Sequence, residues 1–588
     1  MNFLRNLFAS ILGTFIALGI ILVLFIIVIS AMASSVGGIE NVELKSNSVL
    51  ELKLETLVKD YAPKSDDPFD KLFGFNDDKI GLNSIINAIE NAKYDENIKG
   101  ISITTLGINA GIAQTQAIRN KLLEFKETGK FIKAYADIYD QKSYYFSSVA
   151  DSIFMNPVGA IDFKGLSSEI LFFKDIEDKT GVKMEVIRHG KYKSAVEPFL
   201  YNEMSDANRD QITTFLKSIW DEMVVDISNS RKLTIEEINT IADNLLARNA
   251  ILAIENKIID GAIYVDEYTN KLKLELGLSV EEDLNTISLT DYISAGKGRT
   301  TSTASDKIAV IYAQGEIIYG KGDENLIGQD LIIKALKKAK KDTNVKAIVL
   351  RINSPGGSAL ASELIWRELE LTKKELPLVV SMGNVAASGG YYLACSADRI
   401  FAEPTTITGS IGVFGVIPNF SELANTIGIN AEQVSTNKGA GYSVFEPMTD
   451  EFRLVTTEGV EAVYTTFLDR VAKGRNMTVE AVDSIAQGRV WSGVDALNKG
   501  LVDELGNLDD AISYAAELAE ITDYKVRNYP SYKVELEDRF NSFPFMKTKE
   551  KVLMEELGEA NYKIYKTVKE FSKLKGIQAR MPYVIDIQ

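Results

Sequence analysis

The sequence has very few of the side chains that build disulfides and metal centres: its 588 residues include one cysteine and one histidine. Cys395 alone cannot form a disulfide within the chain, and one histidine with one cysteine is a poor ligand set for zinc. Basic residues are also fewer than acidic ones: the chain has 65 Lys and Arg and 82 Asp and Glu, which gives a net charge of −17. That balance argues against nucleic acid and against a basic membrane-binding face. We therefore expect no metal, no redox cofactor and no nucleic-acid partner.

Long apolar runs are equally scarce, and a single one stands near the N-terminus, "LFASILGTFIALGIILVLFIIVISAM" (Leu7–Met32). It carries no charge and exceeds the roughly 20 residues that cross a bilayer. A cleaved signal peptide would have a shorter apolar region, although the "AMASS" that ends the run leaves cleavage open as an alternative. Arg5 precedes the run and no positive charge directly follows it, which places the chain after Gly37 outside the cytoplasm. The sequence thus predicts a single-pass anchor with a large extracytoplasmic body.

The rest of the chain is an internal repeat. Hydrophobic residues make up 46% and charged residues 25%, as in ordinary globular proteins long enough for two to four domains. At a shift of about 247 residues, "KIGLNSIINAIENAKYDENIK" (79–99) aligns without gaps to "LIGQDLIIKALKKAKKDTNVK" (326–346) with ten identities. Further on, "SYYFSSVADSIFMNP" matches "GYYLACSADRIFAEP", and "GKYKSAVEPF" matches "GAGYSVFEPM". The polar stretch 294–307 between the copies is typical of a linker.

Each copy alternates short strands with amphipathic helices. In the second copy, "KIAVIYA", "VKAIVLRI" and "LPLVVSM" are β-branched runs, whereas "GQDLIIKALKKAKKD" and "ASELIWRELELTKKE" have apolar residues at helical spacing. Alternation of this kind indicates βα units with crossover helices. We predict an α/β fold in both copies.

One serine, Ser388, stands between small residues in "NVAASGGYY". Such a serine is either a nucleophile on a tight turn with free backbone N–H groups beside it or a helix start where nothing larger fits. The aligned residue of the first copy is Gln141, and Ser410 of "TGSIGV" is likewise replaced there, by Phe163. The pattern by itself does not decide between a divided catalytic site and chance divergence.

Lys193, in "YKSAVEPF", shows the opposite pattern: the first copy has the lysine, and the second copy has Tyr442 at the aligned position. A lysine can take the proton of a serine hydroxyl if burial lowers its pKa toward neutrality. Its neighbours Ala195, Val196 and Phe199 could close over it at a domain interface. The alternative is a surface lysine without a catalytic role.

The loop "RINSPGGSA" follows a strand and precedes a helix in the second copy. Gly356 and Gly357 have no side chains, so they can leave backbone N–H groups exposed to a ligand oxygen. A strand–helix loop that merely needs glycine is the alternative, and the first copy has "GINAGIAQT" there.

Two other residues could in principle take part in catalysis, His189 as a base and Cys395 as a reactive thiol. His189 stands four residues before Lys193, and an imidazole is a common general base in enzymes. Its neighbours in the sequence are cationic, however, and no carboxylate flanks it. We expect it to be a bystander. Cys395, in "YYLACSAD", is expected to lie in the core and not to react.

Taken together, the anchor, the two copies, "YKSAVEPF", "SPGG", "AASGGYY" and "TGSIGV" resemble the signal peptide peptidase A (protease IV) family in its long, membrane-anchored form. The match covers nearly the whole chain. It implies two tandem ClpP/crotonase-like domains after a transmembrane helix: an anchor at 1–36, a first repeat at 37–293, a linker at 294–307, a second repeat at 308–530 and a helical extension at 531–588.

The resemblance also implies roles for individual residues. Ser388 would be the nucleophile, Lys193 the general base and Ser410 the residue that orients the lysine; the N–H of Gly389, with that of Gly356 or Gly357, would hold the oxyanion. Substrates would be leftover signal peptides and other apolar, unfolded peptides, cleaved without a cofactor. The family further implies a homotetramer in the bacterial cytoplasmic membrane, with its catalytic bodies on the periplasmic or extracytoplasmic side.

Two other classes stay open on the residues alone. A crotonase-like acyl-CoA enzyme would use the glycine loop without a serine nucleophile, and a silent membrane scaffold would use neither Ser388 nor Lys193. No role is assigned to the C-terminal extension.

Overall fold

The computed structural model describes residues 5–6, 10–21, 23–24, 44–63, 79–300, 302–437, 439, 441–532, 558, 562 and 577–581. Much of the predicted anchor at 7–32 and most of the C-terminal extension lie outside these ranges. Within the described residues, no helix combines the length and the apolar character needed to span a membrane.

The first repeat is built on a six-stranded sheet in the order β8-β6-β5-β4-β1-β9, in which every pair is parallel. Its strands are β1 (Ser48–Leu52), β4 (Ile98–Ile103), β5 (Phe131–Tyr139), β6 (Ser152–Ile161), β8 (Gly261–Ala262) and β9 (Thr286–Ser288). Helices α3 (Leu82–Tyr94) and α4 (Ile112–Lys126) lie between successive strands. Parallel strands require such crossovers, and the predicted α/β alternation is confirmed here.

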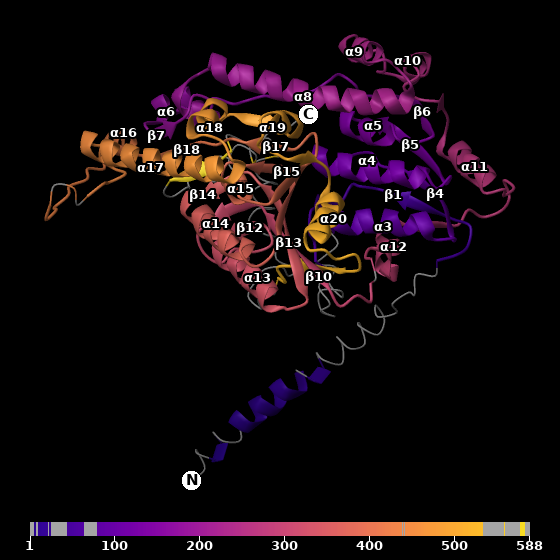
Figure 1. Ribbon diagram of the computed structural model, residues 1–588, viewed down its shortest axis with the longest axis horizontal. Coiled ribbons are helices and arrows are strands. Elements are labelled where there is room, and N and C mark those ends of the chain that lie inside the picture. The colour runs from indigo at the N-terminus through magenta and orange to yellow at the C-terminus, as the bar shows by residue number, and fades with distance from the viewer. Residues whose placement is uncertain are drawn as a thin grey trace.

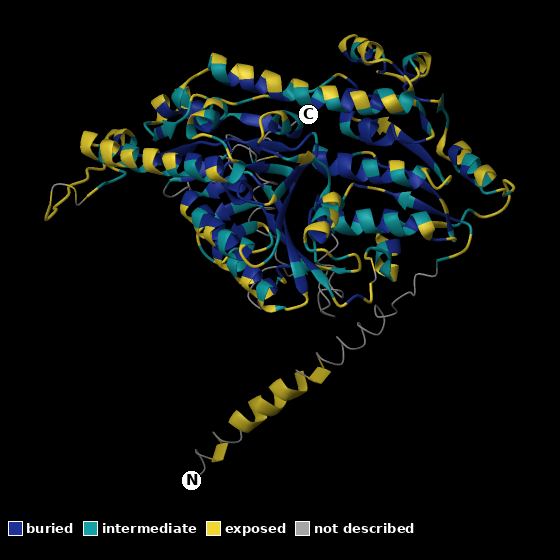
Figure 2. Cartoon of the chain, viewed as in Figure 1, coloured by how far each residue is buried: buried dark blue, intermediate teal, exposed yellow. Residues whose placement is uncertain are grey.

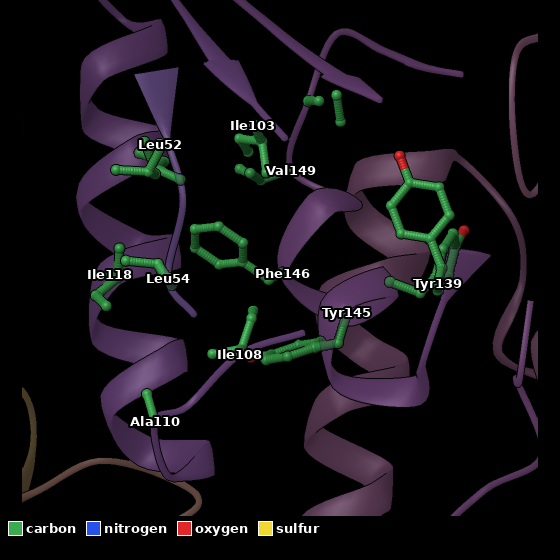
Figure 3. Close-up of a cluster of buried hydrophobic side chains, with 14 of the residues drawn as sticks. Leu52, Leu54, Ile103, Ile108, Ala110, Ile118, Tyr139, Tyr145, Phe146 and Val149 are labelled. Carbon is green, nitrogen blue, oxygen red and sulfur yellow. The ribbon is translucent and has the colours of Figure 1, made fainter. Parts of the chain in front are cut away.

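The core of the first repeat lies between its sheet and its helices. Phe146, from helix α5 (Gln141–Ser147), points into a cluster with Leu54, Ile103 and Ile108, all of them buried (Figure 3). Strand β4 is buried along most of its length: Ile98, Ile101 and Ile103 lie in the core, Ser102 is a buried polar residue, and Lys99 is exposed.

The second repeat has an eight-stranded sheet with the path β19-β17-β15-β13-β10-β21, while β16 pairs with β15 and β20 with β16. Its strands are β10 (Lys307–Gln314), β13 (Val345–Ser354), β15 (Leu378–Ala387), β16 (Arg399–Ala402), β17 (Ile407–Gly409), β19 (Val490–Ser492), β20 (Glu504–Leu505) and β21 (Lys525–Tyr529). Helices α13 (Gln329–Lys341) and α14 (Ala359–Lys373) form where the helical spacing predicts them. The central strands are buried, whereas the helices alternate buried and exposed residues (Figure 2).

A third sheet joins the two repeats, in the order β12-β11-β14-β22-β18-β7. It contains β7 (Lys183–His189) of the first repeat and β11 (Glu316–Ile318), β12 (Leu326–Gly328), β14 (Gly356–Ser358) and β18 (Val413–Asn419) of the second, together with β22 (Gln578–Arg580) from near the C-terminus. Strands β7 and β18 are antiparallel along their whole length. Because of this pairing, the residues that follow β7 in the first repeat lie against the second repeat.

Helix α8 (Asp206–Arg231) adds a second link, because it runs across both repeats along the top of Figure 1. Its Ser218 hydroxyl lies 2.7 Å from that of Ser492 in β19. Two independent contacts therefore fix the repeats against each other.

Candidate active site

Ser388 is the single residue between strand β15 and helix α15 (Gly389–Ala394). Its backbone has φ 55° and ψ −115°, a conformation that is costly for a residue with a side chain and that tends to occur at functional sites. The Ser388 N–H donates to the Gly409 carbonyl at 2.8 Å, and the residue is fully buried. The small neighbours seen in the sequence allow this sharp turn.

Lys193 lies in the loop directly after β7, so the pairing of β7 with β18 brings it beside Ser388. Its Nζ lies 2.9 Å from Ser388 Oγ, 3.0 Å from the Ser410 carbonyl oxygen and 3.1 Å from Ser410 Oγ. Three residues singled out in the sequence, from two different repeats, thus meet within one chain.

The surroundings of the lysine are apolar. Lys193 has no exposed surface, and its Nζ lies 6.0 Å from the centre of the Phe414 ring. Phe414 and Val416 of β18 form one buried cluster with Ala195 and Val196. Because burial disfavours the charged ammonium, the pKa of Lys193 lies well below its usual 10.5.

Two glycines of the second repeat make the room that this side chain needs. A Cβ at Gly488 would lie 2.6 Å from Lys193 Cβ, and one at Gly412 would lie 3.2 Å from Lys193 Cδ. Gly488 also has φ 81°, so a larger residue there would be strained as well as crowded. Gly488 stands far from "YKSAVEPF" along the chain, so no local motif marks it.

The lysine loop is held in place by Gln211, which no sequence motif marks. Gln211 of α8 donates from Nε2 to Ser194 Oγ at 2.7 Å and to the Tyr192 carbonyl at 3.2 Å, and its Oε1 accepts the Val490 N–H. One buried amide therefore ties the lysine loop to helix α8 and strand β19. Nothing in the local sequence marks Gln211, since these partners come from two other segments of the chain, the lysine loop and strand β19.

The expected oxyanion glycines lie together next to Ser388. Gly356 and Gly357 have φ of 96° and 152°, and a Cβ at Gly356 would lie 2.7 Å from the Gly389 nitrogen. The Gly356 N–H donates to Ser354 Oγ at 3.2 Å. Of the two alternatives for the second oxyanion donor, the geometry therefore favours Gly357.

His189 and Cys395 have other partners. His189 Nδ1 lies 2.7 Å from Glu461 Oε1, and the ring stacks on Tyr464 with centroids 3.9 Å apart. No carboxylate flanks His189 in the sequence, but in the folded chain Glu461 reaches it from helix α17 (Asp450–Arg475). Cys395 is buried, and burial raises the pKa of its thiol to about 12, which makes it unreactive.

No group of three or more His, Cys, Asp or Glu side chains in the described part of the chain is placed to hold a metal ion. The groups that meet at Ser388 are two hydroxyls, one amine and the backbone of the glycine loop.

Comparison with known proteins finds relatives that cover most of the chain. The model of peptidase family S49 matches residues 124–279 and 370–522, and the Clp protease model matches residues 299–408. "Protease 4" of Haemophilus influenzae is 36% identical over 533 residues, covering 88% of this chain and 85% of that protein. "Protease 4" of Salmonella typhi is 37% identical over 472 residues, covering 78% and 76%. "Serine protease SPPA, chloroplastic" of Arabidopsis thaliana is 32% identical over 501 residues, covering 83% and 72%.

These matches confirm the predicted fold class of two tandem ClpP-like α/β repeats and the predicted family. With more than half of the chain matched by one family model and a relative covered over most of its length, the chain belongs to peptidase family S49, the family of signal peptide peptidase A, and is a serine-type peptidase.

Proposed function

We propose that this peptidase works through a Ser388/Lys193 dyad, divided between its two repeats. The observation that carries the proposal is the 2.9 Å contact between Ser388 Oγ and the fully buried Lys193 Nζ. A serine hydroxyl is a poor nucleophile until a base takes its proton, and a lysine is a base only when neutral.

The hydrogen bonds of Lys193 suit the neutral amine. A neutral amine has two N–H donors and one lone pair, and the two Ser410 oxygens can accept both donors. The lone pair is then left for the Ser388 hydroxyl. Ser410 acts in this scheme as a positioning residue that orients the amine.

In the reaction, Lys193 takes the Ser388 proton as Oγ attacks the peptide carbonyl carbon. The Gly389 and Gly357 N–H groups stabilise the oxyanion that develops on the carbonyl oxygen. Lys193 then gives its proton to the leaving amine, and a water activated by Lys193 hydrolyses the acyl-enzyme. No cofactor takes part.

The proposed substrates are cleaved signal peptides and other apolar, unfolded peptides at the extracytoplasmic face of the bacterial cytoplasmic membrane. Family membership supports the substrate class, and the charge-free run Leu7–Met32 supports attachment to the membrane. The described helical residues 10–21 leave large apolar side chains exposed, among them Leu12 at 63% and Phe15 at 70%, as a membrane-embedded helix does outside lipid. The homotetramer and the domain division 37–293, 294–307 and 308–530 belong to the same proposal.

A fluorophosphonate probe tests the dyad, because it labels only an activated serine. We expect labelling of the detergent-solubilised full chain, and its loss in both Ser388→Ala and Lys193→Ala. Cys395→Ser serves as a matched control for a buried polar substitution and should label normally. Labelling that survives in Lys193→Ala would rule out Lys193 as the base, and labelling that survives in Ser388→Ala would rule out the proposed nucleophile.

A further inference from the structure

The ladder between strands β13 and β15 is interrupted shortly before the candidate nucleophile. It pairs Ile352 with Met382. Its next pair is Ser354 with Ala386, so three residues of β15, 383–385, stand opposite a single residue of β13. We call residues 383–385 the bulge. Bulges bend a strand and re-aim the side chains that follow, and they are frequent next to active sites.

The bulge sets how the serine and the glycine loop face each other. Ser388 lies directly after the end of β15, beyond the bulge. Gly356 and Gly357 lie on the other strand, shortly after Ser354. Because Ser354 pairs with a residue beyond the bulge, a change of register there would shift Ser388 relative to both glycines.

Arg351 of β13 holds the start of the bulge. Its Nη1 donates to Ser381 Oγ and to the Met382 carbonyl, both at 2.8 Å, and the residue is 2% exposed. A guanidinium carries several N–H donors in one fixed plane. A single side chain of β13 therefore fixes a hydroxyl and a main-chain carbonyl of β15 at the same time.

Two further side chains hold the rest of the bulge. Asn353 Oδ1 accepts the Val385 N–H at 3.2 Å, and Thr406 Oγ1 donates to the Gly383 carbonyl at 2.8 Å. Buried backbone groups need such partners wherever a ladder is interrupted. The course of β15 just before the serine is therefore specified by side chains.

The guanidinium of Arg351 is held in turn by a carboxylate of the first repeat. Asp60, directly after strand β2 (Leu57–Lys59), accepts on its Oδ1 from Arg351 Nη2 at 3.2 Å and from Gln114 Nε2 at 3.1 Å. The side chains of Asp60 and Arg351 are 1% and 2% exposed. A Cβ at Gly383 would lie 2.7 Å from Asp60 Oδ2, so the carboxylate also packs against the bulge.

The first repeat differs at the positions that hold the bulge. The aligned residues there are shorter or apolar: Thr104 for Arg351, Leu106 for Asn353 and Ala134 for Ser381. The ladder between β4 and β5 ends at the pair of Ile103 and Ala134. A buried ion pair adds little net stability, because the loss of hydration offsets the attraction of the charges. Positioning of the turn that carries Ser388 explains the pair better.

We propose that the buried pair of Asp60 and Arg351 positions the bulge, and through it the Ser388 turn relative to the oxyanion glycines. This inference rests on the proposed function of Ser388 and Lys193. Both partners act through the backbone of β15 and not by contact with the reacting atoms, so they are positioning residues. The first repeat then contributes two groups to the site in the second repeat, the lysine and the carboxylate that fixes Arg351.

The test removes the pair without leaving an unpaired buried charge. The double variant Asp60→Asn, Arg351→Met loses both charges together, which folded proteins tolerate far better than the loss of one partner. We expect kcat for an unfolded peptide to fall about 100-fold, the effect of misplacing reacting groups by about 1 Å, with KM within about twofold. A kcat equal to that of the unaltered chain, with Ser388→Ala inactive, would overturn the inference and leave the proposed function standing.

The matched control is the buried arginine of helix α4. Arg119 has a side chain that is 1% exposed and lies 3.8 Å from Asp226, and its hydrogen-bond partners belong to the first repeat. The double variant Arg119→Met, Asp226→Asn should keep kcat and KM within about twofold. A loss of kcat as large as that in Asp60→Asn, Arg351→Met would overturn the positioning role, because any buried ion pair would then have the same effect.

Hydrogen exchange decides the inference without catalysis. The Val385 N–H bonds to Asn353 and the Ser388 N–H to the Gly409 carbonyl, so the exchange of these two amides reports local opening around the bulge. We expect both amides to exchange about tenfold faster in Asp60→Asn, Arg351→Met than in the unaltered chain, and at unchanged rates in the control variant. Equal exchange rates in all three chains would overturn the inference, even if the dyad itself proved wrong.

Discussion

The two repeats make the same strand-to-helix turn in different ways. In the first, β5 passes into α5 through Asp140, which caps the helix at φ −80° by accepting the Ser143 N–H. In the second, β15 passes into α15 through Ser388 at φ 55°, without a side-chain cap. The turn at Asp140 has an ordinary backbone conformation and a capped helix. The turn at Ser388 is strained, and its hydroxyl contacts Lys193.

The aligned positions show the same division. Gln141 uses its side-chain oxygen to accept the N–H groups of Lys164 and Gly165, whereas Ser388 aims at Lys193. Phe163 packs against Tyr144 and Trp220 where the second repeat has Ser410. The first repeat thus builds structure at the positions where the second places its hydroxyls, and contributes the lysine instead.

The sharpest contrast is between Ser388→Ala and Gln141→Ala. We expect Ser388→Ala to lower kcat/KM for an unfolded peptide by about 10⁴-fold or more, because nothing replaces the nucleophile. Gln141→Ala should leave kcat/KM within about twofold and lower the free energy of unfolding by about 1 kcal/mol, since two N–H groups lose their acceptor. Peptide cleavage assays and denaturant unfolding measure the two. A large loss of kcat/KM in Gln141→Ala would contradict the claim that the first repeat uses this position for structure alone.

Part of this arrangement could be predicted from the sequence, because the two repeats can be aligned and their differences compared position by position. The βα alternation predicts the sheets of both repeats. The difference between the copies at Lys193 and Ser388 marks both residues as candidates, and the family resemblance implies that they meet. Contacts between distant segments were not predictable: the β7–β18 pairing, Gln211, and Glu461 beside His189 depend on partners roughly 200 to 300 residues apart. The inserted strand β22 was hidden for the same reason, because its partners β14 and β18 lie far from it along the chain.

The next effect concerns the pKa of Lys193. Because burial lowers that pKa and the neutral amine is the active form, kcat/KM should fall about tenfold per pH unit below the folded-state pKa. Between that pKa and the usual 10.5, the unfolded chain binds a proton that the folded chain does not. The free energy of unfolding should therefore rise with pH across this window, relative to Lys193→Met. Identical pH slopes for the two chains would contradict the burial argument.

Replacement of Ser410 should have a smaller effect. Ser410→Ala removes one of the two oxygens that orient the amine and leaves the main-chain carbonyl in place. A hydrogen bond of about 1 kcal/mol corresponds to a loss of about five- to tenfold in kcat, with KM nearly unchanged. Phe163→Leu at the aligned position of the first repeat is the control, and it should affect only stability. A rise in KM in place of a fall in kcat would assign Ser410 to substrate binding.

The smallest effect is expected for His189, although it is the residue that chemistry would first suggest as a base. Its ring contacts Glu461 and stacks on Tyr464 where β7 lies against α17, whereas the Ser388 hydroxyl contacts Lys193. We expect His189→Gln to leave kcat/KM within about twofold, and Glu461→Gln to behave alike. An imidazole base would also give a pH profile with an inflection near 6.5 that disappears in His189→Gln. A profile that is unchanged in His189→Gln and altered in Lys193→Met would assign the proton to the lysine, the residue that the first repeat contributes to the serine of the second.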